Sequence, residues 1–155
     1  MLEGFRQGIR NDGRGTSDCR SFSLHPGTVP EAFGSCTLKF GQEDTQIVCA
    51  IKAEILKPME SEANKGQISF YLESSQTGRS LFVREDQADS MKQRMQNIIQ
   101  NLFSNLIDRQ ELCIFKGEFC WNLHVDLLVF DELSMEQLDY IGLCLRGAFK
   151  DLQLP

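Results

Sequence analysis

A short stretch near the start of the chain carries the densest set of side chains able to bind anions or one another. Gly8–Arg20 contains three arginines, two aspartates and three glycines. This composition builds neither an apolar helix stripe nor a strand alternation, and glycine permits backbone dihedrals that other residues avoid. The stretch therefore predicts an ordered loop in which guanidinium and carboxylate groups pair, with a solvated N-terminal tail as the alternative.

A second candidate for chemistry is a histidine and an aspartate two residues apart, His124 and Asp126. The segment 119–130 alternates well enough to predict a strand, so the two side chains lie next to each other on one face. A His–Asp pair suggests catalysis, but no candidate nucleophile is tied to it in the sequence. A satisfied structural pair is therefore the favoured interpretation.

The elements that must position these residues follow from hydrophobic periodicity. Strands are predicted at 21–24, 34–40, 45–55, 67–72 and 119–130, with a hairpin connection at 41–44. Both faces of 45–55 are apolar enough to predict a central strand covered on both sides. The order of strands and helices predicts a two-layer α+β domain with helices packed on a mixed sheet.

Two helices complete this layout. Apolar residues at helical spacing predict an amphipathic helix of about five turns whose buried stripe is Met91, Met95, Ile98, Leu102 and Leu106, widened by Ile99 and Phe103. Ser134 and Gln137 have capping-box spacing for a second helix that begins near Met135. Gly142 and Gly147 weaken that helix and suggest close packing against a neighbouring element.

Composition narrows the class of protein. The chain has 155 residues, a net charge of −6 and a pI of about 4.9, which disfavours gripping nucleic acid alone through a broad basic face. Any RNA contact must be local or shared with partners. The six cysteines lack a Cys-x-x-Cys pair, which indicates free thiols in a reducing compartment rather than a zinc site. No apolar run approaches the roughly 20 residues of a membrane span, so cytosol or nucleus is expected.

Several separated blocks, in order, resemble the ribonuclease PH family. They are the N-terminal stretch Gly8–Arg20, the Gly34–Ser35 pair that opens a strand, and the blocks Ile51–Ile55, Leu112–Ile114 and Cys120–Asp126. The likeness is greatest to the non-catalytic ring subunits of the RNA exosome. It implies a two-layer ribonuclease PH-like (ribosomal-protein-like β-α-β-α) domain over 1–155, with 1–20 as an ordered N-terminal loop. The resemblance also implies that these residues are the first half of the usual subunit and that its second half is absent from them.

The resemblance also allows the catalytic parts to be checked. In phosphorolytic members a Gly-Thr-Arg turn between the long strand and the last helix holds phosphate. Here that position reads Asp131, Glu132, Leu133, Ser134, Met135 and Glu136, with no glycine or arginine. Three carboxylates would repel phosphate, and the family's catalytic aspartates belong to the missing second half. The resemblance therefore implies a non-catalytic subunit with no cofactor.

RNA contacts are implied at another place. In the family, arginines in the loop before the first helix and near the start of that helix line the RNA path. Arg79 and Arg84 are the matching positions in this sequence, and Lys92 and Arg94 are weaker candidates.

The leading interpretation is a non-catalytic, structural, RNA-contacting subunit of the exosome ring, acting in 3′-to-5′ RNA processing and degradation, rRNA processing included. Its partners would be RNA and other ribonuclease PH-like ring subunits in a hetero-oligomer, located in the nucleus, nucleolus and cytoplasm. One alternative is an RNA phosphorolase completed by a second half and a neighbouring subunit. Another is a stand-alone interaction domain of the same fold. The apolar faces of the long strand, with only two helices to cover them, also predict dependence on partners for solubility.

Overall fold

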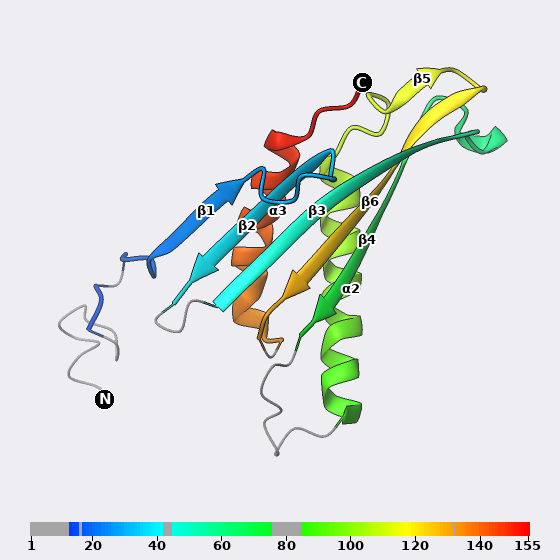
Figure 1. The fold of residues 1–155 in the computed structure, drawn as a ribbon. Coiled ribbons are helices and arrows are strands. Elements are labelled where there is room, and N and C mark those ends of the chain that lie inside the picture. The colour runs from blue at the N-terminus through cyan, green and yellow to red at the C-terminus, as the bar shows by residue number, and fades with distance from the viewer. Residues whose placement is uncertain (1–12, 16, 42–44, 76–84, 132) are drawn as a thin grey trace.

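A computed structural model of the chain describes residues 13–15, 17–41, 45–75, 85–131 and 133–155 (Figure 1). The elements in chain order are β1 (Phe22–Pro26), β2 (Gly34–Phe40), β3 (Thr45–Leu56), the 3₁₀ turn η1 (Glu60–Glu62), β4 (Gln67–Ser74), α2 (Glu85–Leu106), β5 (Cys113–Phe115), β6 (Phe119–Val129), the 3₁₀ turn η2 (Met135–Gln137) and α3 (Leu138–Asp151). The predicted strands and both predicted helices are present.

The described strands form a single mixed sheet. Their order is β1-β2-β3-β6-β4, and the short β5 pairs with the start of β6. β4 runs parallel to β6, whereas the other neighbours are antiparallel. The predicted mixed sheet is therefore confirmed, and β3 is central because it lies between β2 and β6.

Both helices lie on the same face of this sheet, α3 across β1–β3 and α2 along β4 (Figure 1). Residues on that face, such as Cys49 on β3 and Val125 on β6, are fully buried. On the opposite face Lys52 and Glu54 of β3 are exposed. The prediction that β3 is covered on both sides is therefore wrong. Its apolar Val48 is only half-buried and lies beside a cross-strand neighbour, Leu128.

The buried stripe of α2 contains only part of the predicted one. Met95 and Ile99 are fully buried and Phe103 packs against the core, whereas Leu102 is 51% and Leu106 is 75% exposed. Met95, Ile99 and Phe103 recur every four residues, and so do Ile98, Leu102 and Leu106 on the neighbouring stripe of the helix. Periodicity alone therefore favours neither series. The sheet selects the stripe that contains Met95 and Ile99.

Glycine sets the close approach of α3 to the sheet. A Cβ at Gly147 would lie 2.6 Å from Cys36 Sγ, and one at Gly34 would lie 2.6 Å from the carbonyl oxygen of Ala148. At Gly142 the nearest atom would be Phe103 Cζ at 3.7 Å, an ordinary contact. The predicted close packing is thus found at Gly147 and not at Gly142.

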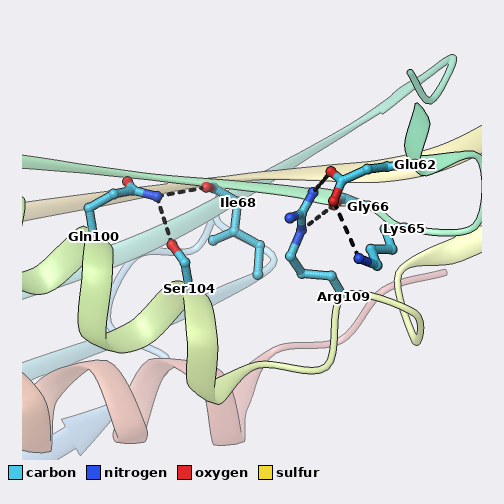
Figure 2. A network of polar contacts seen from close by, with 7 residues as sticks. All are labelled: Glu62, Lys65, Gly66, Ile68, Gln100, Ser104 and Arg109. Carbon is cyan, nitrogen blue, oxygen red and sulfur yellow. Dashed lines mark hydrogen bonds and ion pairs between the residues drawn. The ribbon is translucent and has the colours of Figure 1, made fainter. Parts of the chain in front are cut away.

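The outer edge of β4 is covered by polar groups from α2 and the loop that follows it (Figure 2). Phe70 N donates to Gln100 Oε1 at 3.1 Å, and Gln100 Nε2 donates to Ile68 O at 3.3 Å. Arg109 Nε donates to Gly66 O at 2.8 Å, and Gly66 N donates to Arg109 O at 2.8 Å. These contacts occupy backbone groups that another strand could otherwise pair with.

Arg109 also fixes η1 to this edge. Its Nη2 lies 2.7 Å from Glu62 Oε2, and Lys65 Nζ lies 3.3 Å from Glu62 Oε1 (Figure 2). The hydrogen bond from Arg109, followed by that from Lys65, lowers the pKa of the Glu62 carboxyl. The loop before β4 is therefore tied to the loop after α2.

Within the described residues, no helix is both long and apolar enough to cross a membrane.

Candidate nucleic-acid interface

The described part of the N-terminal stretch forms a hydrogen-bonded turn. Arg14 Nη1 donates to Asp18 O at 3.0 Å, Gly15 N donates to Asp18 Oδ2 at 2.8 Å, and Asp18 N donates to Gly15 O at 3.2 Å. Gly13 has a φ of 80°, which favours glycine. Residues 1–12 and 16 lie outside the described residues, so an ordered loop over the whole of 1–20 stays a prediction.

The turn between β6 and α3 that contains Asp131 and Glu136, called the acidic turn below, is where the resemblance places the family's phosphate-binding turn. Ser134 N donates to Gln137 Oε1 at 3.1 Å, and the Ser134 side chain accepts from the Gln137 backbone amide, so the predicted capping box is present. Gln137 N also lies 3.1 Å from the Ser134 carbonyl oxygen. Two backbone amides of the turn are therefore engaged within it. Asp131 and Glu136 are exposed, and Glu132 lies outside the described residues.

The carboxylates of this turn contact other parts of the chain. Thr45 Oγ1 donates to Asp131 Oδ2 at 3.3 Å, and Glu136 Oε2 lies 3.9 Å from Arg20 Nη2, at the end of the N-terminal stretch. The Arg20–Glu136 pair is exposed and contributes little stability. What the turn presents to solvent is negative charge, which opposes the binding of free phosphate.

The two weaker cationic candidates on α2 differ in their surroundings. Lys92 Nζ lies 2.9 Å from both carboxylate oxygens of Glu73 on β4. Arg94 is exposed, and no carboxylate among the described residues lies within ion-pair distance of it. It lies on a shallow, open surface of α2 together with Ser90, Gln93, Asn97, Ile98 and Asn101. Arg94 is therefore better placed than Lys92 to contact a phosphate.

The leading candidates for RNA contact, Arg79 and Arg84, lie outside the described residues. Their role stays a prediction. The difference between Lys92 and Arg94 was missed by the sequence analysis, because Glu73 reaches Lys92 from another element. No local pattern signals that contact.

His124 and Asp126 lie on the open face of the sheet and have separate partners. His124 Nε2 lies 2.9 Å from Glu54 Oε1, and Lys52 Nζ lies 2.9 Å from Asp126 Oδ2. Asn122 Nδ2 donates to Glu54 Oε1 at 2.8 Å. The contacts with His124 and then Asn122 lower the pKa of Glu54, and the hydrogen bond to Asp126 raises the pKa of Lys52.

Each member of the His124–Asp126 pair is thus satisfied by β3 rather than by the other. The stacked ring of Tyr71, with its centroid 6.1 Å from that of His124, adds a neighbour from β4. These contacts are those of a satisfied structural pair. In the described part of the chain, no three His, Cys, Asp or Glu side chains gather as metal ligands.

The mixed sheet with both helices on one face is the architecture of a ribonuclease PH-type domain. Residues 18–155 match the model of the RNase PH family, described as "3' exoribonuclease family, domain 1". The chain belongs to this family.

Curated relatives with similar sequences are named as exosome components. The chain is 34% identical over 152 residues to exosome complex component rrp43 of Schizosaccharomyces pombe, covering 96% of this chain and 54% of the relative. It is 30% identical to exosome complex component Rrp42 of Methanopyrus kandleri, covering 84% of this chain and 49% of the relative. It is also 30% identical to human exosome complex component RRP45, over 82% of this chain and 28% of the relative.

Solved structures agree with the fold. An archaeal exosome core superposes with a TM-score of 0.71 at 26% identity, covering 99% of this chain and 57% of that one. The Archaeoglobus fulgidus exosome with RNA bound to the active site gives a TM-score of 0.70 at 26% identity, covering 99% and 60%. The chain thus spans about half the length of the rrp43 and Rrp42 relatives and 57% of the matched chain of the archaeal exosome core.

Proposed function

We propose that the chain is a non-catalytic, RNA-contacting part of an RNA exosome ring, acting in 3′-to-5′ RNA processing and degradation. The observation that carries this proposal is the likeness of nearly the whole chain to exosome components in both sequence and structure. Its partners would be other ribonuclease PH-like ring subunits and RNA. Nuclear, nucleolar and cytoplasmic locations, with a part in rRNA processing, belong to the same proposal.

The lack of catalysis is supported by the chemistry of the acidic turn. A phosphate receptor at a helix start combines free backbone amides with a cation, as a glycine turn and an arginine provide. This turn instead presents Asp131 and Glu136 to solvent and engages the Ser134 and Gln137 amides internally. The cation that reaches it in the described part is Arg20, and Arg20 faces Glu136.

We expect no release of nucleoside diphosphate from single-stranded RNA in the presence of inorganic phosphate. The assay uses the chain alone and the chain in a reconstituted ring whose other subunits are catalytically disabled. A phosphorolytic ring assembled with an active relative is the positive control. Phosphate-dependent turnover that disappears when Asp131 is replaced by alanine would support the phosphorolase alternative instead.

RNA contact is expected to depend on arginines and to be shared within the ring. Replacing Arg79 and Arg84 together by alanine should weaken RNA retention in a reconstituted ring. It should also reduce the slope of log affinity against log salt by about 0.7 for each RNA phosphate that the protein no longer neutralises. The measurement is single-stranded RNA binding over a salt series, with little change expected in sequence preference.

Two single variants on α2 provide a matched comparison. Arg94→Ala should weaken RNA binding more than Lys92→Ala, because Glu73 already neutralises Lys92. Both substitutions remove one positive charge from the same helix, so general electrostatics affects them alike.

Equal salt slopes for the wild-type ring and the Arg79/Arg84 double variant would show that those two arginines are surface charges only.

A further inference from the structure

Two cysteines lie directly opposite each other where β5 pairs with β6. Cys113 is the register partner of Cys120, and Trp121 N donates to Leu112 O at 2.8 Å. Antiparallel ladders alternate between hydrogen-bonded and non-hydrogen-bonded pairs. Since Leu112 and Trp121 form a hydrogen-bonded pair, Cys113 and Cys120 form a non-hydrogen-bonded one.

This kind of pair is suited to a covalent link. Its Cα atoms are about 4.5 Å apart and its side chains point to the same face. Disulfides join Cα atoms that are about 4.4–6.8 Å apart, so the backbone of β5 and β6 need not move far. The influence of Cys113 on the pKa of Cys120 is a further sign that the two thiols are close.

The two thiols differ in access, as an attacking and a resolving cysteine do. Cys113 is half-buried, so a small molecule can reach it, whereas Cys120 is fully buried with Sγ 3.5 Å from Leu56 O. Burial raises the pKa of Cys120, and the nearby Arg109 guanidinium partly offsets this by lowering it. The same arginine secures the loop beside this hairpin (Figure 2).

We propose that Cys113 and Cys120 are a reversible disulfide-forming site that reacts with low-molecular-weight disulfides such as oxidised glutathione. The Cys113 thiolate attacks one sulfur of glutathione disulfide, and one glutathione thiolate leaves. The Cys120 thiolate then attacks the Cys113 sulfur and displaces the second. The two protein thiols lose two protons and two electrons, which glutathione disulfide gains in becoming two thiols.

The other cysteines provide internal controls. Cys36 and Cys49 are also opposite each other, on β2 and β3, but both are fully buried under α3. Cys144 Sγ donates to Cys36 O at 3.3 Å in that same closed region. Cys19 is exposed. We therefore expect Cys19 to take a glutathione adduct, and Cys36, Cys49 and Cys144 to stay reduced in the folded protein.

The bond would fix the weakest part of the sheet. β5 has three residues, and its pairing with β6 is irregular between Cys113 and Phe115. Phe115 and Phe119, at the end of this hairpin, are 62% and 48% exposed. A link between Cys113 and Cys120 would hold these apolar side chains in one arrangement, because it closes the loop that carries them.

The test is to incubate the reduced, folded chain with oxidised glutathione, quench with acid, digest it and analyse the peptides by mass spectrometry. We expect peptides joined through Cys113 and Cys120, with both thiols released by dithiothreitol. Cys120→Ser should keep glutathione on Cys113, and Cys113→Ser should leave Cys120 unmodified. The readout does not require a monodisperse sample.

Three results would overturn the inference. One is a wild-type chain that retains glutathione on Cys113 without forming the link. A second is Cys113 joined to Cys19 rather than to Cys120. The third is an unmodified Cys113 under conditions in which Cys19 has fully reacted.

Discussion

Gly147→Ala in α3 is expected to lower the free energy of unfolding by about 2 kcal/mol, although alanine is the better helix former. A Cβ at this position would lie 2.6 Å from Cys36 Sγ, 3.2 Å from Cys36 Cβ and 3.1 Å from Leu24 Cδ2. Cys36 is fully buried and cannot turn aside into solvent. Overpacking of this kind costs about 1–3 kcal/mol, and a 2.6 Å approach to a buried side chain places this site at the upper end. The gain in helix propensity offsets about 1 kcal/mol of that cost.

Gly142→Ala in the same helix is the matched control. Its Cβ would meet only Phe103 Cζ, at 3.7 Å, so the propensity gain of about 1 kcal/mol should remain. The measurement is urea unfolding followed by circular dichroism, with both variants compared at the same protein concentration. Equal shifts in the same direction would contradict the packing argument, because helix propensity alone would then explain both.

The contrast between these glycines shows how far the sequence could predict the fold. Both glycines lie within the same helix, and the sequence pattern predicts close packing at each of them equally. The position of β2 under α3 decides which one is in close contact, and that position depends on residues more than 100 apart in the chain, as in the hydrogen bond from Cys144 Sγ to Cys36 O.

Strands with strong alternation were predictable, whereas weak elements were not. β2, β3, β4 and β6 follow from side chains that alternate between a core and an open face. β5 has three residues and no alternation to detect, so the sequence analysis missed it. It exists because Leu112 O accepts from Trp121 N on a strand already fixed in the sheet.

The candidate site shows the same division. The acidic character of the turn at Asp131–Glu136 is a property of the sequence itself. The partners of His124 and Lys92 are not, since Glu54 and Glu73 come from other strands. Family likeness indicated the positions of Arg79 and Arg84, and the described residues leave that prediction untested.

The isolated chain is expected to depend on partners for its solution behaviour, because large apolar side chains remain exposed at one end of the sheet. Ile55 near the end of β3 is 56% exposed, and Phe115 and Phe119 in the β5–β6 hairpin are 62% and 48% exposed. The middle of the open sheet face is instead polar, with the Lys52–Asp126 pair on it. This group of exposed apolar side chains thus lies at the end of the long strands rather than along the face of β6.

An exposed apolar surface of a few hundred Å² is enough to matter for association. An apolar patch beyond about 300–600 Å² is unusual on a soluble monomer and commonly marks an interface. At roughly 25 cal/mol per Å², burying about 300 Å² contributes about 7 kcal/mol before the entropy of association is subtracted. That is comparable to the net stability of a whole domain, about 5–15 kcal/mol.

We therefore expect the chain alone to self-associate or to melt at low temperature, and to become monodisperse when coexpressed with exosome ring subunits or a second ribonuclease PH-like half. Phe115→Glu should make the isolated chain less prone to self-associate and should weaken its association with those partners. Lys116→Gln, at an exposed neighbour in the same hairpin, is the control because it makes the chain more negative by the same single charge. The measurements are light scattering after size exclusion and copurification of the coexpressed subunits. A monomeric chain of ordinary thermal stability with no affinity for ring subunits would contradict the expectation and favour a stand-alone domain.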